Sequence, residues 1–210
     1  MIFTHCLNFF LLTVVSNIDL MFLVETSTKV TKKDLEGIEK LIQSFATHHS
    51  EQSTVKVGII AFSEDIQIIQ KLQILNNDGS KVLTRALTQL TGEPGLGDAL
   101  EKSANHLIQH TSTSQNTNRK VIVSIVKTLN TKEISKARNI VFKMQQRVKD
   151  LQVMSIVFDD GVVGYDDLLK VVSPLATVPK ATNILIAPIQ VDKLLTSVPS
   201  ELASKMLRGM

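Results

Sequence analysis

Residues 18–24 read IDLMFLV, a nearly continuous apolar run of the kind expected for a β-strand that is buried on both faces. A strand of this kind needs a sheet whose two faces are both covered. Similar apolar runs occupy residues 55–62, 121–126, 153–158 and 183–187. The chain is therefore predicted to build a sheet with several fully internal strands.

Amphipathic segments separate most of these strands. Apolar side chains recur at helical spacing in residues 35–45 and 134–148, and Thr31 with Asp34 forms a helix-start signal before the first of them. Further helices are predicted in the following ranges: 82–90, 97–108, 165–172 and 191–207.

The turn Ser-Glu-Asp at residues 63–65 joins the strand 55–62 to another strand, 66–72. So short a turn allows an antiparallel hairpin but no crossover connection. The element order therefore predicts an α/β fold: a doubly wound, mostly parallel six-stranded sheet of the Rossmann-like kind, with one antiparallel edge strand and helices on both faces.

The composition limits the function classes. With 210 residues, 43% hydrophobic and 20% charged, the chain fits one domain with a substantial core. A net charge of +3, evenly spread, does not favour a nucleic-acid surface. Cys6 is the single cysteine, which excludes an internal disulfide and a thiolate metal cluster and by itself favours a reducing compartment.

Residues 1–16, MIFTHCLNFFLLTVVS, resemble a secretory signal, because an apolar stretch is followed by the small residue Ser16. The segment has no Lys or Arg, however, and its apolar stretch is shorter than the roughly 20 residues that span a bilayer. A signal peptide and a buried N-terminal extension both stay open for residues 1–16. No membrane insertion is expected, and residues 17–210 are predicted to form the domain.

In doubly wound sheets, ligands bind at the carboxyl ends of the strands, where the strand order reverses. Those ends carry ETSTK, KTLN and FDDGVVG, and the loop TGEPGLG lies beside them. The turn after the first strand has no glycine for a dinucleotide, and no P-loop motif occurs. No histidine lies at a strand end to activate Ser27, so neither a cofactor nor catalysis is predicted.

These motifs, in this order, resemble the von Willebrand factor type A domain over nearly the whole chain. IDLMFLVETS matches the family's first strand, D-hydrophobic-x-F-L-hydrophobic-D-x-S, and VKVGIIAFS matches its second. LTGEPGLGDAL matches the GGTxTGxAL loop, and KVIVSIV the strand that normally ends in T-D-G. The resemblance implies the fold predicted above.

The resemblance also implies a metal-ion-dependent adhesion site, in which oxygen ligands hold a divalent cation. Carried over position by position, its five ligands fall on Glu25, Ser27, Lys29, Pro94 and Lys127. Two of these are cations and one is a proline, so the site is expected to be degenerate and to hold no metal. One hypothesis pairs the Lys127 ammonium with Glu25 in the vacated pocket, and the alternative turns both side chains out to solvent.

Among subfamilies, the FLVETS and FSEDI patterns and the short loops resemble the A domains of collagen VI α chains. This implies a secreted, non-catalytic extracellular matrix module that takes part in cell adhesion and matrix assembly by binding matrix proteins or collagen chains. The alternative is an intracellular A-domain scaffold in a multiprotein complex. Cleavage after Ser16 in a secretory expression system would favour the first.

The partner surface is expected at the carboxyl end of the sheet, where Lys29 and Lys127 suit an acidic partner group. The side chains assigned to it are Thr26, Thr28, Lys29, Glu93, Leu96, Lys127, Asp159, Asp160 and Tyr165.

Overall fold

The computed structural model describes residues 17–49, 55–74, 86–111, 118–127, 131–148, 151–159 and 184–188. The predicted helices 165–172 and 191–207, and the leader 1–16, lie outside these residues. The elements are, in chain order, β1 (Ile18–Glu25), α1 (Lys32–His49), β2 (Val55–Phe62), β3 (Ile66–Ile74), α2 (Leu96–Thr111), β4 (Arg119–Val126), α3 (Thr131–Arg147), β5 (Leu151–Asp159) and β6 (Ile184–Pro188).

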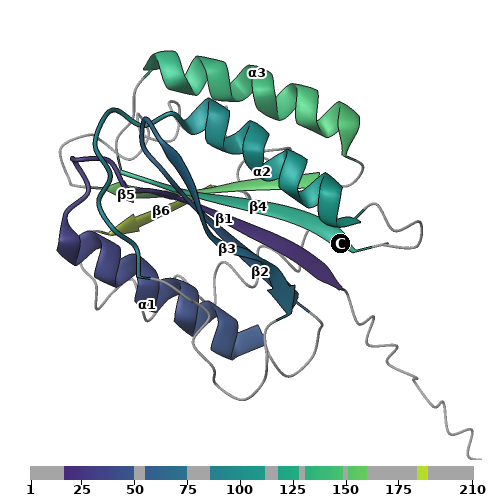
Figure 1. Cartoon of the computed structure of the whole chain (residues 1–210), viewed down its shortest axis with the longest axis horizontal. Helices are drawn as coiled ribbons and strands as arrows, with labels where there is room; N and C mark the ends of the chain where they lie inside the picture. Colours follow the sequence, from purple (N-terminus) through teal and green to yellow (C-terminus); the bar gives the residue numbers. More distant parts are fainter. Residues whose placement is uncertain are drawn as a thin grey trace, which may run out of the picture.

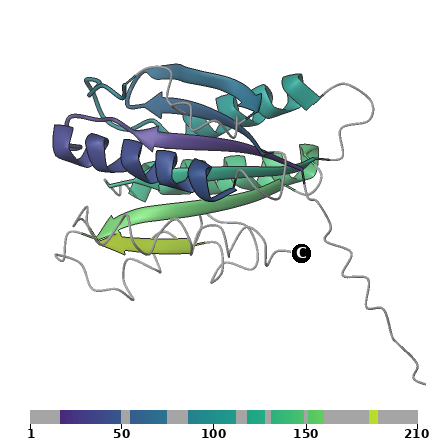
Figure 2. The same cartoon turned by 90° about the horizontal axis from the view of Figure 1, so that it is seen from below.

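The described strands form one six-stranded sheet in the order β3-β2-β1-β4-β5-β6. β1 pairs in parallel with both β2 and β4, β4 with β5, and β5 with β6, whereas β3 runs antiparallel to β2. Figure 2 shows β3 at one end of the sheet and β6 at the other. The predicted doubly wound fold, with its antiparallel edge strand, is confirmed.

Helices cover both faces of the sheet, α1 on one and α2 with α3 on the other (Figure 1). Leu35, Ile38, Leu41, Ile42 and Phe45 of α1 pack on Leu20 and Phe22 of β1 in one core cluster. The opposite cluster joins Met21 and Leu23 to apolar residues of α2 and α3. Successive β1 side chains thus enter opposite cores, which explains why the sequence of this strand shows no polar face.

The segment before α2 differs from the prediction. Residues 86–90 are not helical, although their apolar spacing predicted a helix over 82–90. Their backbone donors are instead bound by distant residues: the amide of Leu87 donates to the Glu39 carboxylate and that of Leu90 to the carbonyl of Thr26. Tertiary hydrogen bonds therefore override the local helical pattern.

None of the helices in the described ranges combines the length and apolarity needed to cross a bilayer.

Candidate functional site

The candidate site lies where the strand order reverses, at the carboxyl ends of β1 and β4. β1 is the first strand in the sequence, yet it lies in the middle of the sheet. The chain adds β2 and β3 on one side of β1, and then β4, β5 and β6 on the other. Glu25 ends β1, and Lys127 follows directly after β4. The loop of residues 26–31 and the segment 86–95 lie next to them, as the hydrogen bonds below establish.

Glu25 is a buried carboxylate whose two oxygens both accept hydrogen bonds. Glu25 is 1% exposed. Oε1 accepts from the Ser27 hydroxyl at 2.7 Å, and Oε2 accepts from the backbone amide of Lys127 at 2.8 Å. A carboxylate taken out of water needs such donors to offset its lost hydration. Glu25 thus links the end of β1 to the end of β4.

The Lys127 ammonium forms an ion pair with Asp34, with Nζ at 2.7 Å from Oδ2. This corrects the hypothesis that pairs the ammonium with Glu25, which contacts the backbone amide of Lys127 instead. The alternative, with both side chains turned to solvent, is wrong as well, because Glu25 is buried and the Lys127 side chain is only 21% exposed. The ion pair thus joins the residue after β4 to the first turn of α1.

Asp34 has a second role at the start of α1. Its Oδ2 accepts hydrogen bonds from the amide and the hydroxyl of Thr31, both at 2.8 Å, and the Asp34 amide donates back to the Thr31 hydroxyl at 3.2 Å. This is the helix-start signal expected from the sequence. Burial by itself would raise the pKa of Asp34, but the hydrogen bonds from Lys127 and Thr31 together outweigh it and hold the pKa below its usual value.

We expect the contribution of Asp34 to stability to disappear in acid. A depressed pKa in the folded state means that the contribution is complete above the unfolded value, about 4, and is lost as the pH falls through the lower folded value. Asp34→Asn should therefore cost about 1–3 kcal/mol at neutral pH, and the difference from the original chain should shrink below about pH 4. Urea unfolding at a series of pH values measures this.

The control for that experiment is Glu93→Gln, since the ion pair of Glu93 with Lys29 has side chains that are 67% and 55% exposed. An exposed pair of this kind contributes about 0–1 kcal/mol. A difference for Asp34→Asn that stayed constant down to about pH 2 would contradict the assignment of the depressed pKa.

Gln89 holds the loop after β1 in place. Its side-chain amide donates to the carbonyls of Thr28 and Val30 at 2.9 and 2.8 Å, and lies 3.5 Å from that of Ser27. The sequence gives no signal for this role, because a glutamine outside any motif contacts a loop some 60 positions earlier in the chain. The loop that carries Lys29 is thus fixed from two sides, by Glu25 and by Gln89.

Two residues predicted to contact a partner are buried. Thr26 is 0% exposed, and its amide and hydroxyl both donate to the carbonyl of Phe62, at 2.8 and 3.3 Å. Leu96 is 5% exposed and packs in the core cluster under α2. Both stabilise the domain from within, so we remove them from the predicted contact surface.

The segment that contains Pro94 is tied to the end of β2. The Gly95 amide donates to the carbonyl of Ser63 at 2.7 Å, and the Ser63 hydroxyl donates to the carbonyl of Thr91 at 2.6 Å. Gly92 has φ +90°, a left-handed conformation that a side chain disfavours, and an added Cβ would meet Glu64. The backbone is therefore held firmly, with Pro94 buried in it.

Thr28, Lys29 and Glu93 are the predicted contact residues that are exposed at this edge, with Lys29 Nζ 3.4 Å from Glu93 Oε2. This ion pair brings together two of the predicted contact residues from loops that are 64 positions apart. Asp159 ends β5 opposite Pro188 of β6. Asp160 and Tyr165 lie outside the described residues.

Comparison with known proteins bears on this arrangement. The family model described as von Willebrand factor type A domain matches residues 19–170 of the chain, from the second residue of β1 to beyond the end of β5, and so includes Glu25, Pro94 and Lys127. The chain belongs to the von Willebrand factor type A (vWA) family. Among curated proteins, none has a significant sequence match.

Solved structures share the vWA fold at low sequence identity. Two structures of proximal thread matrix protein 1 from the mussel byssus, one of them described as crystal form 2, superpose with TM-scores of 0.63 and 0.61 at 13% and 14% identity. Each match covers 89% of this chain and 47% of that one. A structure of the same protein "with zinc occupied MIDAS motif" gives a TM-score of 0.62 at 13% identity, over 90% and 46%. The chain thus spans about half the length of these proteins.

The five positions that the sequence resemblance assigns to metal ligands are all among the described residues. Glu25 and Ser27 contact each other, Lys29 and Lys127 each pair with a carboxylate, and Pro94 has no side-chain oxygen. Within the described ranges, no group of three or more His, Cys, Asp or Glu side chains is placed to hold a metal ion.

Proposed function

We propose that this chain is a protein-binding vWA module of the extracellular matrix that recognises its partner without a metal ion and catalyses nothing. The observation that carries the proposal is the state of Glu25. The residue at the first ligand position uses both carboxylate oxygens for hydrogen bonds inside the domain, one to Ser27 and one to the Lys127 amide. A module of this kind contacts its partner directly, with no metal ion between them.

The residues at the site do not fit a divalent cation. Mg²⁺ requires near-octahedral oxygen coordination. Here the second serine of the motif is replaced by Lys29, the loop threonine by Pro94 and the last aspartate by Lys127, leaving Glu25 and Ser27 as oxygen donors. An ammonium group ~4 Å from a divalent cation would repel it by about 8 kcal/mol in a partly screened site, because the cation carries two charges.

The matrix assignment is drawn from a sequence pattern and from the fold. The pattern FLVETS resembles the collagen VI A domains, and the solved structures with this fold include a matrix protein of the mussel byssus. At 13% identity that likeness extends to the fold alone. We propose a secreted protein that binds matrix components or collagen chains, with an intracellular scaffold as the alternative.

The contact surface proposed at this edge consists of Thr28, Lys29, Glu93 and Lys127, joined by Asp159, Asp160 and Tyr165 from the sequence. Of the two lysines in this surface, Lys29 is more exposed than Lys127, and its partner Glu93 is more exposed still. An acidic group of a partner protein can replace Glu93 in the pair at little cost, because exposed ion pairs are weak. Lys127, held by the partly buried Asp34, contributes positive potential without moving.

Surface plasmon resonance over immobilised collagen VI tests the proposal. We expect binding to be the same in Mg²⁺ and in EDTA, and Lys29→Glu to weaken it about tenfold, since a repulsion then replaces an attraction across the interface. Calorimetric titration of the free domain with Mg²⁺ or Mn²⁺ should show no heat of binding.

Micromolar binding of either metal, or loss of the collagen signal in EDTA, would contradict metal independence. Equal binding by Lys29→Glu would move the contact surface away from the carboxyl edge. Lys40→Glu, an exposed charge reversal of the same kind on α1, is the matched control.

A further inference from the structure

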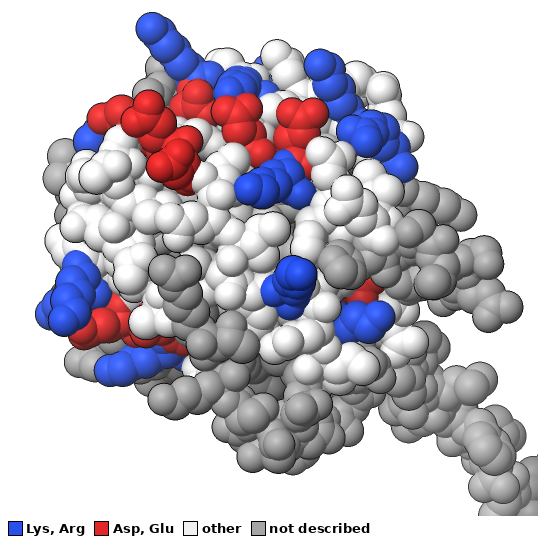
Figure 3. All heavy atoms as spheres, in the orientation of Figure 1, with Lys and Arg blue, Asp and Glu red and all other residues white. Residues whose placement is uncertain are grey.

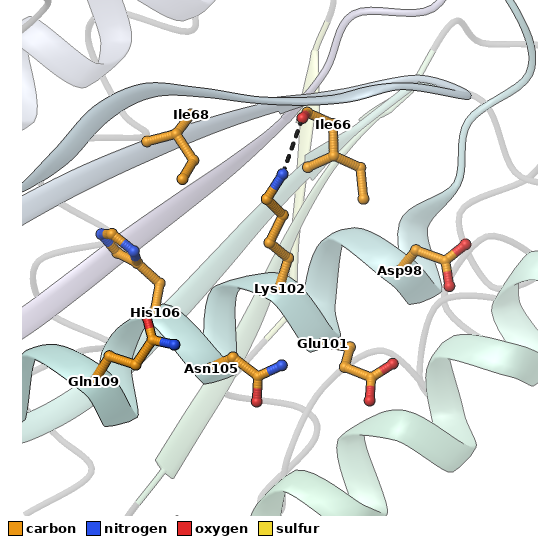
Figure 4. Close-up of a pocket in the computed structure, with 8 residues that line it drawn as sticks. All are labelled: Ile66, Ile68, Asp98, Glu101, Lys102, Asn105, His106 and Gln109. Carbon is orange, nitrogen blue, oxygen red and sulfur yellow. Dashed lines mark hydrogen bonds between the residues drawn. The ribbon is translucent and has the colours of Figure 1, made fainter.

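A groove opens between the edge strand β3 and helix α2, beginning beside the turn that joins β2 to β3. Its volume is about 430 Å³, and Ile66 and Ile68 of β3 face Lys102, Asn105 and His106 of α2 across it (Figure 4). Ile68 is 40% exposed, and Ile74, further along the same strand, is 54% exposed. Exposed β-branched side chains on an edge strand form a surface that favours contact with another extended chain.

β3 is the end strand of the described sheet, so its outer backbone edge faces the groove. The Lys102 ammonium, 3.1 Å from the carbonyl oxygen of Ile66, shows that this carbonyl points outward. In an antiparallel ladder the outward direction recurs at every second residue, and Ile66 and Ile68 pair in regular register with Phe62 and Ile60 of β2. The backbone groups of Ile68 therefore point to the same side.

Beyond Ile68, irregular pairing between β2 and β3 makes the outer edge of β3 unsuitable for a further strand. The register shifts twice between β2 and β3, so β3 holds extra residues opposite Val57–Ile60. Bulges of this kind prevent open-ended pairing along an edge. The part of the edge that can accept another strand is thus short, and it is the part that borders the groove.

Acidic side chains surround the same place. Glu64 and Asp65 occupy the turn just before β3, and Asp98 and Glu101 lie on the first turns of α2, all four exposed. Figure 3 shows acidic side chains gathered in the upper part of this face. Lys136 pairs with Asp98 at 2.8 Å, and Lys102 is engaged with the Ile66 carbonyl, so two cations stand against four carboxylates. The rim therefore favours a positively charged occupant.

We propose that this groove binds an extended segment of a partner protein in which apolar and basic residues alternate, and that the segment pairs with β3 at Ile66 and Ile68 as an added strand. Strand addition provides main-chain hydrogen bonds, while side chains on one face of the segment enter the groove. Because side chains alternate along a strand, the basic residues are the ones that enter the groove, where their methylene stems contact Ile66 and Ile68 and their ammonium groups reach Glu101. The apolar residues point to the opposite face of the strand. Lys102 gives up the Ile66 carbonyl to the incoming backbone amide.

The test uses the full chain and a blocked, fluorescently labelled hexapeptide that alternates valine with lysine. Fluorescence anisotropy should show saturable binding. The same peptide with N-methyl groups on alternate residues, which cannot complete the ladder, should bind at least tenfold more weakly. Glu101→Lys should also weaken the unmethylated peptide at least tenfold, because the change replaces attraction by repulsion at the rim.

Glu36→Lys is the matched control, an identical charge reversal on the exposed side of α1, on the opposite face of the sheet. It should leave peptide binding within twofold. Ile68→Thr keeps a β-branched residue on the strand, and its lost apolar contact should weaken binding about threefold to tenfold.

Each other outcome overturns the proposal. Equal binding by the N-methylated peptide would show that charge alone holds the peptide and that no strand is added. The absence of saturable binding would show that the groove is not a peptide site. Concentration-dependent dimerisation in sedimentation, abolished by Glu101→Lys, would assign the groove to a second copy of the chain. None of these results depends on Lys29 or on metal independence. The groove proposal and the proposed function can therefore be contradicted independently of each other.

Discussion

Replacing Glu25 by alanine is expected to lower the free energy of unfolding by about 2–4 kcal/mol, measured by urea or guanidinium unfolding. The substitution removes the acceptor of two hydrogen bonds and leaves the Ser27 hydroxyl and the Lys127 amide without it. Because Glu25 is 1% exposed, bulk water does not reach these two donors, and their lost hydrogen bonds are not replaced from solvent. The ends of β1 and β4 lose the side chain that joins them.

Two controls separate this effect from a general loss of charge. Glu93→Ala removes a carboxylate whose side chain is 67% exposed, and should change stability by no more than about 0.5 kcal/mol. Ser27→Ala removes only one of the two donors, and should cost about 1 kcal/mol. If Glu25→Ala were as stable as Glu93→Ala, the structural role given to the carboxylate would be incorrect.

Phe22→Ala should be more damaging still, with a loss of about 3–5 kcal/mol. Phe22 is fully buried in the centre of β1, and its ring meets that of Phe45 on α1 edge to face, with the centroids 5.7 Å apart and the planes at 81°. Truncation leaves a cavity between the sheet and the helix. Domains of this size are stable by about 5–15 kcal/mol, so a large share of the total is at stake.

Phe142→Ala provides the same chemical change at a surface position, since Phe142 is 63% exposed on α3, and it should cost no more than about 0.5 kcal/mol. A double-mutant cycle of Phe22→Leu with Phe45→Leu should give a coupling of about 0.5–1.5 kcal/mol from the ring contact. A loss below about 1 kcal/mol for Phe22→Ala would show that the core can collapse around the missing ring.

The fold was predictable where the hydrophobic pattern had one structural solution. β1 and β2 carry apolar residues on both faces, which only a sheet covered on both sides accommodates. The turn before β3 is too short for a crossover, so β3 could only pair antiparallel to β2. The segment 86–90 was not predictable, because the residues that bind its amides, Glu39 and Thr26, belong to other parts of the chain.

The site was predictable in its location but not in its contacts. The family pattern placed Glu25, Ser27, Lys29 and Lys127 at one edge, and the structure brings the first two together with the Lys127 backbone. The pairing of the ammonium with Asp34 was missed, because the sequence already gave that carboxylate a helix-start role, and one oxygen serves both. No local pattern marks Gln89, whose contacts depend on the final packing of two loops.

The order of the strands has a consequence for how the chain folds as it is made. β1 is paired on one side by residues that begin at Val55 and on the other by residues that begin at Arg119. Until β4 has been synthesised, β1, which is buried along its whole length in the folded domain, has one open edge, and such an edge is a template for association with other unfinished chains. This delay makes the nascent N-terminal half a natural client for chaperones, and truncations that end before residue 119 should be aggregation-prone rather than stable fragments.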